Sequence, residues 1–275
     1  MIFIRVIGDY GPLGDMAFAE VTDRLHAQVR NASVKDYQLH LSSVPAFDTY
    51  ATGFMLAQLA VNSPLGKDHF FYVNTAPRKD NKSARMNNEG EGLVYARLKN
   101  GVQIVAVNSG YSMTLIKPFA EEIKLLNVDK AGSQFRSRDN FPIALGAVLK
   151  GDKSIFGPDV RTSVPDEFPA NRVVYTDGYG NLKCSIDPAQ IEKDKGKKVH
   201  LHIEGSNEQV PVTVGQGIFD VADGEFCFAK GSSGWKTPDG LSIAFSEIVK
   251  RGGNASKTFS FPEGGAKVEW RLVAR

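Results

Sequence analysis

The pattern of hydrophobic residues changes once along this chain, and that change limits the folds open to it. Residues 1–156 alternate short apolar runs, such as 69–73, with segments of helical period, such as 15–29. This alternation predicts an α/β domain with a mostly parallel sheet covered by helices. Residues 173–275 carry only short strand patterns separated by turns. They predict an all-β, barrel-like domain.

A proline-containing segment separates the two patterns. Residues 157–172 include Pro158, Pro165 and Pro169 and have no long apolar run, which is typical of a linker between domains. At 275 residues the chain is long enough for each domain to bury its own core. We therefore expect an α/β domain at 1–156, a linker at 157–172 and a β-barrel domain at 173–275.

Three local sequence patterns predict individual elements of the first domain. The apolar residues of 15–29 recur at helical spacing, and Gly151 ends a second helix expected at 141–149. Asn100-Gly101 joins strands expected at 92–97 and 102–107, because Asn-Gly favours a tight hairpin turn. Residues 74–88 are polar and basic, and we expect an exposed loop of functional interest.

The composition narrows the range of partners. The net charge is +2, so no nucleic-acid partner is expected. The chain has only two cysteines, and none of its five histidines has metal-ligand spacing, so we expect no metal and a reducing compartment. No apolar run is long enough for a signal peptide or a membrane span, so we expect a soluble, cytoplasmic protein without a membrane partner.

The segment 173–186 holds the most informative polar motif. It predicts two short strands joined by Asp177-Gly178-Tyr179-Gly180-Asn181, a sequence suited to a tight turn. Taken alone, Asp-Gly and Gly-Asn are ordinary turn dipeptides. A ligand-binding role depends on matching motifs elsewhere in the chain.

Five segments in order along the chain resemble those of one family. They are IRVIGDYGPLGD at 4–15 (T-D-[FL]-G and a further Asp), SVPAFD at 43–48 (P-[FW]-D), FRSRD at 135–139 (F-[HY]-[GS]-R-[DE]), DGYGN at 177–181 (D-x-F-G-N) and GSSGW at 231–235 (N-S-S-G-Y). Together they resemble the S-adenosylmethionine hydroxide adenosyltransferases and S-adenosylmethionine-dependent halogenases, the fluorinases and chlorinases. The chain is similar to a divergent member of that family.

The resemblance implies a reaction and a set of ligand residues. In the family a nucleophile displaces methionine from the ribose 5′ carbon of S-adenosylmethionine, and no further cofactor takes part. The matched positions that imply substrate contacts are Asp9, Phe47, Asn108, Phe135, Asp177, Tyr179, Asn181, Ser232 and Ser233. Asp9 stands where the family binds the ribose diol, and Asp177 with Asn181 where it binds the amino-acid end. The ordinary alternatives are helix capping for Asp9 and core packing for the aromatic residues.

The departures from the family concern the catalytic residues. Ala76 and Arg136 stand where hydrolases of the family have the Asp and His of an Asp-Arg-His trio that prepares water. Ser137 resembles the serine of the halogenase branch, so Ser137 and Arg136 are our candidate catalytic residues. Arg136 attracts an anion but repels the sulfonium unless a carboxylate such as Glu89 or Glu91 pairs with it.

Two functions follow from these observations. The first is an enzyme that cleaves S-adenosylmethionine to methionine and adenosine, or to a 5′-halo-adenosine. The alternative is a protein that binds S-adenosylmethionine or adenosine and has lost the catalytic trio. The resemblance also implies a homotrimer with ligand sites at the subunit interfaces.

Overall fold

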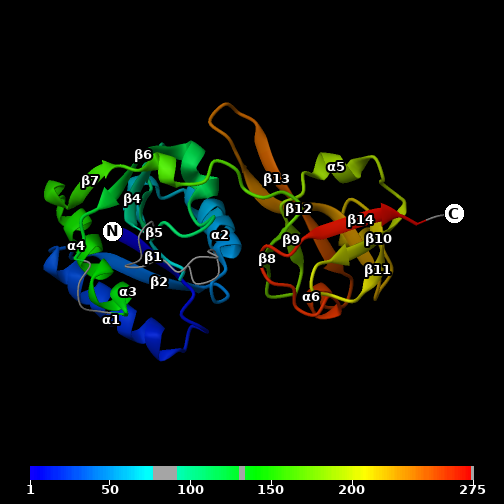
Figure 1. Ribbon diagram of the computed structural model, residues 1–275, viewed down its shortest axis with the longest axis horizontal. Helices are drawn as coiled ribbons and strands as arrows, with labels where there is room; N and C mark the ends of the chain where they lie inside the picture. Colours follow the sequence, from blue (N-terminus) through cyan, green and yellow to red (C-terminus); the bar gives the residue numbers. More distant parts are fainter. Residues whose placement is uncertain (77–91, 130–133, 274–275) are drawn as a thin grey trace. The chain divides into compact units, whose positions relative to one another are not determined.

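The chain forms two compact units, each built around one sheet of seven strands (Figure 1). The structure, a computed structural model, describes residues 1–76, 92–129 and 134–273. The first unit is Met1–Glu167 and the second is Phe168–Arg275, and they are called unit 1 and unit 2. Most of the loop expected at 74–88, together with Glu89 and Glu91, lies outside the described residues.

Unit 1 alternates strands and helices in its first half and has more strands in its second. Its strands are β1 (Ile2–Gly8), β2 (Tyr37–Ser43), β3 (His69–Asn74), β4 (Leu93–Leu98), β5 (Gln103–Val107), β6 (Ala120–Leu126) and β7 (Phe156–Asp159). Its α-helices are α1 (Met16–Asn31), α2 (Thr49–Val61), α3 (Arg136–Asp139) and α4 (Phe141–Lys150). Short 3-10 helices are η1 (Gly66–Asp68), η3 (Thr114–Phe119), η4 (Lys153–Ile155) and η5 (Arg161–Ser163).

The sheet of unit 1 is mixed, which corrects part of the expectation. Its strand order is β2-β1-β3-β5-β4-β6-β7. The β2-β1-β3-β5 pairs are parallel, whereas the β5-β4, β4-β6 and β6-β7 pairs are antiparallel. The Asn100-Gly101 hairpin between β4 and β5 is confirmed, and it reverses the strand direction at that point. The parallel character is therefore limited to one half of the sheet.

The helix α1 shows how the sequence period places a helix on this sheet. Asp15 caps its first turn by accepting the Ala17 N–H at 2.8 Å. Phe18, Val21, Leu25 and Val29 are fully buried on the side that meets the core of unit 1. Burying each such side chain stabilises the fold by about 1.5–3 kcal/mol. α1, α3 and α4 cover one face of the sheet and α2 the other (Figure 1).

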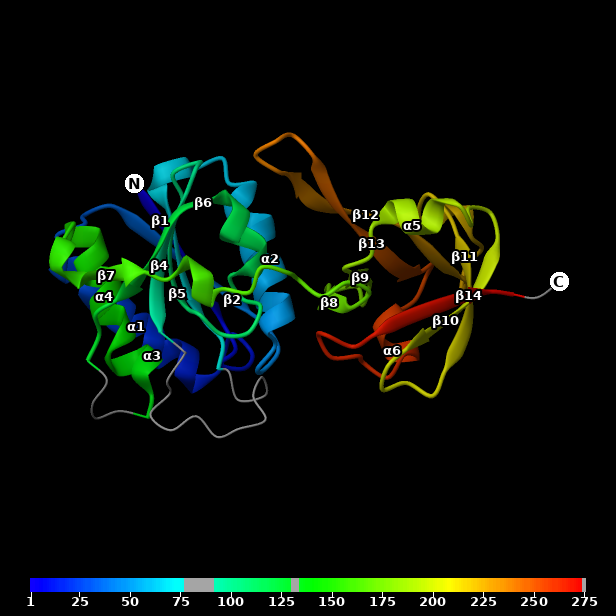
Figure 2. The ribbon, with the colours of Figure 1, turned by 45° about the horizontal axis from the view of Figure 1, so that its top comes forward.

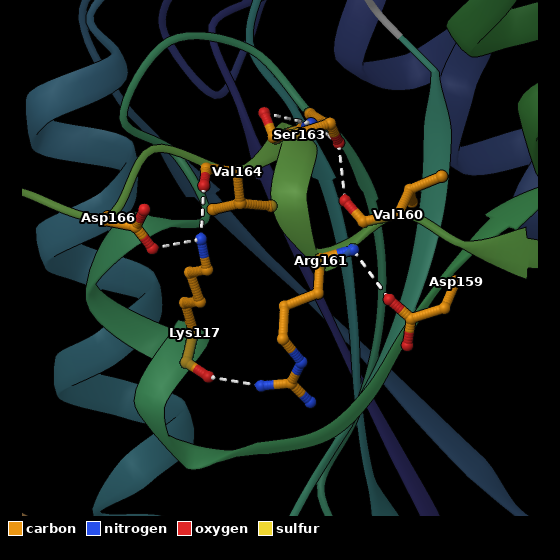
Figure 3. A network of polar contacts seen from close by, with 8 residues as sticks. Lys117, Asp159, Val160, Arg161, Ser163, Val164 and Asp166 are labelled. Carbon is orange, nitrogen blue, oxygen red and sulfur yellow. Dashed lines mark hydrogen bonds and ion pairs between the residues drawn. The ribbon is translucent and has the colours of Figure 1, made fainter.

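The first half of the expected linker is part of unit 1. Residues 156–159 form β7, which pairs with β6 at the edge of the sheet. The segment that follows is tied to η3, because Lys117 Nζ donates to the Val164 carbonyl and pairs with Asp166, each at 2.6 Å (Figure 3). Arg161 also donates to the carbonyls of Lys117 and Ala120, at 3.2 and 2.8 Å. These long-range contacts hold 156–166 on unit 1, and the division between the units falls after Glu167.

Unit 2 consists mainly of short strands. Its strands are β8 (Val173–Thr176), β9 (Leu182–Cys184), β10 (Lys198–Ile203), β11 (Gln209–Val214), β12 (Phe226–Lys236), β13 (Ser242–Lys250) and β14 (Val268–Leu272). Its helical segments are α5 (Pro188–Glu192), η6 (Ile218–Asp220) and α6 (Ala255–Thr258). The strands β12 and β13 extend as a ribbon beyond the rest of the sheet (Figure 2).

The sheet of unit 2 curls into a half-barrel. Its order is β14-β10-β11-β12-β13-β9-β8, and the two edges of the sheet meet through the residues that directly precede β8 and β14. The Val173 N–H donates to the Ala266 carbonyl at 2.9 Å, and the Val268 N–H donates to the Asn171 carbonyl at 2.8 Å. The inward face carries the apolar core of this unit, with Phe228 packed edge-on against Trp270.

The stability of unit 1 is expected to fall as the pH drops from about 6.5 to about 4, because of His69. Burial, with a further contribution from the positive charges of Arg5 and His40, lowers the pKa of His69 from 6.5 to about 4. In that interval the unfolded chain binds a proton that the folded chain does not. The contribution of neutral His69 is therefore complete above pH 6.5, and about 1–3 kcal/mol of it is lost by pH 4.

Urea unfolding of the parent and the His69→Gln variant at several pH values measures this effect. The variant should show a shallower loss of stability between pH 6.5 and 4 than the parent. His202→Gln, on β10 of unit 2, serves as the control. Parallel curves for the parent and His69→Gln would contradict the prediction.

Candidate functional site

The parallel half of the sheet in unit 1 has a topological switch point beside β1. The connection through α1 leads to β2 on one side of β1, and the connection through α2 leads to β3 on the other. In open α/β sheets, ligands bind at the carboxyl ends of the strands at such a point. Asp9 follows β1 at that edge, and Thr75 and Ala76 follow β3.

The Asp9 carboxylate draws together the loops that follow β2 and β3. Its Oδ2 accepts the backbone N–H of Phe47 at 3.0 Å and that of Ala76 at 2.9 Å. The backbone N–H of Asp9 donates to the Asn74 carbonyl at 3.2 Å. Hydrogen bonds to an ionised acceptor are about twice as strong as those between neutral groups. Asp9 therefore organises this edge of the sheet and does not cap a helix.

Phe47 holds an unusual backbone conformation next to Asp9. Its φ is +63°, in the left-handed region that side-chain-bearing residues rarely adopt. The following residue, Asp48, is buried and caps α2 by accepting the Ala51 N–H at 2.8 Å. Such backbone strain persists only where surrounding contacts impose it, and it is often found at functional sites. The N–H donated to Asp9 is one of these contacts.

A pair of buried threonines supports the same edge from beneath. Thr52 of α2 donates to the Asp48 carbonyl at 2.8 Å, and its hydroxyl lies 2.6 Å from that of Thr75. Both threonines are fully buried. Because buried hydroxyls are costly unless they are hydrogen-bonded, this network fixes α2 against the loop after β3.

Contacts with two tyrosines, Tyr72 and Tyr10, connect Ser137 and Phe135 to the end of unit 1 where Asp9 lies. The Tyr72 hydroxyl donates to the Ser137 carbonyl at 2.6 Å, and the Tyr10 ring lies edge-on to Phe135 with centroids 6.1 Å apart. Ser137 is only 6% exposed. Asp9, Phe47, Phe135 and Ser137 are thus brought together, with Tyr10 as the link between them.

The two arginines of α3 have different surroundings. Arg138 donates to both carboxylate oxygens of Asp139, at 2.8 and 2.9 Å, and to Glu20 of α1 at 3.0 Å. The Arg136 guanidinium lies over the Phe141 ring, 5.4 Å from its centroid. The positive charge of Arg138 is therefore balanced by its acidic neighbours.

Asn108 lies at the end of β5 and has a structural contact. Its amide donates to the Ser163 hydroxyl at 3.0 Å and to the Ser163 carbonyl at 3.4 Å. Ser163 is part of the segment shown in Figure 3. Asn108 thus helps to hold residues 159–166 on unit 1.

In unit 2, the DGYGN turn is organised by its own aspartate. Asp177 Oδ1 accepts the backbone N–H groups of Tyr179 and Asn181 at 2.9 and 3.0 Å, and Oδ2 accepts the Asn181 side-chain amide at 3.1 Å. Gly180 is required here, because its φ is +81° and an added Cβ would collide with the Asn254 side chain. The turn geometry therefore accounts for much of this motif.

A partly buried ion cluster extends from the turn across two strands. Lys183 of β9 lies between Asp177, with Nζ 3.6 Å from Oδ2, and Glu247 of β13, with Nζ 2.6 Å from Oε1. Lys183 and Glu247 are direct cross-strand partners. The cluster holds two carboxylates and one ammonium, so its formal charge is −1.

The serines of the GSSGW motif lie on a bulge next to this cluster. The pairing of β12 with β13 shifts register between Lys230 and Gly234. At Gly231 a Cβ would lie 3.1 Å from Glu247 Oε2, so the bulge passes close to that carboxylate. Ser232 is exposed and Ser233 half-buried. Tyr179 is 83% exposed, so unit 2 does not use it as a core residue.

Sequence reasoning missed Tyr10, Tyr72, Lys183 and Glu247. Tyr10 directly follows Asp9 in the first motif, and this position is the feature of the sequence that could have indicated its role. Tyr72 lies within an apolar strand and looks like a core residue. Lys183 alternates with buried Leu182 and Cys184, so it shares a face with polar neighbours, but its partner on β13 is more than sixty positions away.

Neither a cluster of metal ligands nor a membrane-spanning helix is found in the described part of the chain. Within residues 1–76, 92–129 and 134–273, no group of three or more His, Cys, Asp or Glu is placed to hold a metal ion. In the same ranges no helix combines the length and the apolar character needed to span a bilayer.

The fold and the site define a two-unit protein, with an α/β unit followed by a curled β unit. No protein-family model and no curated protein matches the sequence. One solved structure that matches is an uncharacterized conserved protein from Thermotoga maritima, with a TM-score of 0.66 and 17% identity over 96% of this chain and 99% of that one. Another is a conserved hypothetical protein from Thermus thermophilus, with a TM-score of 0.63 and 19% identity over 99% of this chain and all of that one. At these identities the likeness establishes the fold alone.

Proposed function

We propose that this chain cleaves S-adenosylmethionine by substitution at the ribose 5′ carbon and releases methionine and adenosine. The main support is Asp9, whose carboxylate lies at the switch point beside β1 and gathers the loops after β2 and β3. The turn after β1 has neither a Rossmann nor a P-loop glycine pattern, which suits a nucleoside ligand without phosphates.

The chemistry requires positioning more than proton transfer. The sulfonium of the substrate is a good leaving group, so no general acid is needed. The site must hold the ribose, exclude water other than the nucleophile, and align the nucleophile with the carbon–sulfur bond. In the proposal Asp9 accepts hydrogen bonds from the ribose diol, Phe47 and Phe135 contact the adenosine, and Ser137 contacts the nucleophile. Arg136 contributes positive charge from the same short helix.

In this proposal the amino-acid end of the ligand binds to unit 2. Asp177 and Asn181 bind the methionine ammonium and carboxylate, with Ser232, Ser233 and Tyr179 as further contacts. The formal charge of −1 on the Asp177–Lys183–Glu247 cluster supports this assignment, because one added ammonium makes it neutral. Asn108 contacts the ligand only if its side-chain amide gives up its hydrogen bonds to Ser163.

The alternative function is binding without cleavage. Ala76 contributes only its backbone N–H to Asp9, and Arg136 lies over Phe141, so neither supplies the acid–base chemistry of a water-activating trio. The same residues are consistent with a protein that holds S-adenosylmethionine or adenosine as a ligand without cleaving it.

Incubation with S-adenosylmethionine and chromatography of the products separates these functions. Methionine released together with adenosine indicates attack by water, and a 5′-halo-adenosine formed in chloride or bromide indicates attack by halide. Calorimetry provides the second measurement. Binding without any product supports the alternative, and a lack of binding excludes both functions.

The resemblance also implies a subunit assembly and a barrel in unit 2. We propose a homotrimer with ligand sites at the subunit interfaces, and a barrel as the finished form of the curled sheet in unit 2. Sedimentation at working concentrations tests the trimer. A monomer under conditions that give full activity would exclude it.

A further inference from the structure

The Tyr10 hydroxyl is buried without a hydrogen-bond partner among the described residues. It lies close to the side chains of Ser137 and Tyr72, but neither contact has acceptable hydrogen-bond geometry. An unsatisfied buried hydroxyl is costly, and in native proteins it calls for a specific explanation.

The packing around Tyr10 fixes the position of this hydroxyl. The ring lies over the backbone of Gly8, where an added Cβ would be 2.6 Å from Tyr10 Cε2. It is edge-on to Phe18, with centroids 5.1 Å apart, and to Phe135, at 6.1 Å. A ring held on three sides cannot turn its hydroxyl towards solvent, so the polar group is directed into the cluster beside Asp9.

The neighbouring groups leave the Tyr10 proton to be donated elsewhere. Tyr72 uses its own proton on the Ser137 carbonyl, at 2.6 Å. Burial raises the pKa of Tyr10, and the charge of Asp9 raises it further, which together outweigh the lowering effect of the nearby Ser137 and Tyr72 side chains. Burial also raises the pKa of Tyr72. Both phenols are therefore protonated at neutral pH, and Tyr10 needs an acceptor.

We propose that Tyr10 Oη and Ser137 Oγ hold a buried water molecule beside Asp9, and that this water is the nucleophile. The inference rests on the proposed cleavage of S-adenosylmethionine and adds Tyr10 as a catalytic residue that touches the reacting water. Tyr72 is a positioning residue, because it acts through the Ser137 backbone. The cluster has the two or more polar partners that a buried water requires.

Charge favours water over a halide at this position. The Asp9 carboxylate is close enough to raise the Tyr10 pKa, and the same negative charge repels an anion. The Arg138 charge is balanced by Asp139 and Glu20. The Arg136 guanidinium lies over the Phe141 ring. Neutral phenol and hydroxyl donors with a carboxylate nearby match the hydrogen-bonding needs of water.

The step conserves atoms and charge. A lone pair of the water oxygen forms the bond to the 5′ carbon, and the carbon–sulfur bond breaks with its electron pair going to sulfur. The sulfonium becomes the neutral thioether of methionine. The protonated 5′ oxygen then loses one proton to bulk water and leaves adenosine.

Two measurements test the inference, and the first does not depend on catalysis. A crystal structure of the parent at a resolution that shows waters should place one within hydrogen-bonding distance of both Tyr10 Oη and Ser137 Oγ. In Tyr10→Phe that water should be absent. A crystal of the parent soaked in bromide provides the comparison. An anomalous peak from bromide at this position overturns the water site, and so does a lack of density there in the parent without bromide.

Kinetics gives the second measurement. Tyr10→Phe should lower kcat for methionine release about 10- to 100-fold and leave KM within about threefold, because the hydroxyl acts on the nucleophile and not on the substrate. Tyr95→Phe is the matched control, since it removes a core tyrosine hydroxyl that is bonded to Gln103 instead. Equal loss in both variants, or turnover of Tyr10→Phe at the parental rate, overturns the role of Tyr10.

A second pair of variants guards against a folding artefact. Gly8→Ala displaces the Tyr10 ring, whereas an added Cβ at Gly14 meets nothing within 4 Å. Gly8→Ala should reproduce the loss of kcat and Gly14→Ala should not. If the parent binds S-adenosylmethionine but never cleaves it, the proposed function fails and the nucleophile role fails with it. The water site is still judged by the crystal structures.

Discussion

Under the proposed function, replacing Asp9 with alanine is expected to lower methionine release from S-adenosylmethionine at least about 100-fold, because the two strong hydrogen bonds proposed between Asp9 and the ribose would be lost. The same change removes the acceptor for the N–H groups of Phe47 and Ala76. Losing these two charge-assisted bonds should also lower the free energy of unfolding by about 2–4 kcal/mol. Activity and stability are both measured, since the alanine variant alone does not separate them.

The Asp9→Asn variant makes that separation. An asparagine side-chain oxygen can still accept both backbone N–H groups, so the loops after β2 and β3 should keep their positions and most of the stability should remain. The negative charge is lost, so methionine release should still fall about 10-fold or more.

Asp152→Ala is the control for Asp9. Its carboxylate also accepts a backbone N–H, that of Ser154 at 2.9 Å, on the loop after α4. Activity should be unchanged in this variant. Full activity of Asp9→Asn would mean that Asp9 is only an anchor for the loops, and it would remove the main support for the proposed diol contact.

Replacing Lys183 with methionine is expected to lower the free energy of unfolding by about 2–4 kcal/mol. The change keeps the length of the side chain but removes the ammonium between Asp177 and Glu247. The side chains of Lys183, Glu247 and Asp177 are only 12%, 15% and 21% exposed, so the two carboxylates are left poorly solvated and without a counter-charge. Hydrogen exchange of peptides from unit 2 measures the loss where it occurs.

The control for Lys183 lies on the surface of the same unit. Lys195 pairs with Glu192 at 3.4 Å, with side chains 41% and 67% exposed. Lys195→Met should change stability by less than about 0.5 kcal/mol, because solvated ion pairs contribute little. Similar effects of the two substitutions would show that the Lys183 cluster is not a stabilising element.

Lys183→Met also bears on ligand binding. If the cluster receives the methionine ammonium, removing Lys183 makes the site more negative, so affinity for S-adenosylmethionine should be kept or increased at low salt. A decrease in affinity with the fold intact would indicate that Lys183 itself contacts the carboxylate end of the ligand.

Local patterns in the sequence were sufficient to predict several elements. The helix α1 follows from the spacing of Phe18, Val21, Leu25 and Val29, and the end of α4 from Gly151, which has a φ of +73°. The hairpin between β4 and β5 follows from Asn100-Gly101. These features depend on residues within one or two turns of each other, and short-range geometry is written directly in the order of residue types.

The tertiary structure alone decided the strand partners and the contacts of the site. Nothing local makes β6 pair with β4, or brings residues 156–166 back to Lys117 across about forty positions. Asp9 lies in a motif that the sequence indicates, but its bonds to Phe47 and Ala76 span 38 and 67 positions. The bond from Tyr72 to Ser137 spans 65 positions, and that from Lys183 to Glu247 spans 64. Such contacts form only when separate elements pack on one core, so the sequence by itself determined the elements and the candidate residues, whereas packing decided which of them meet.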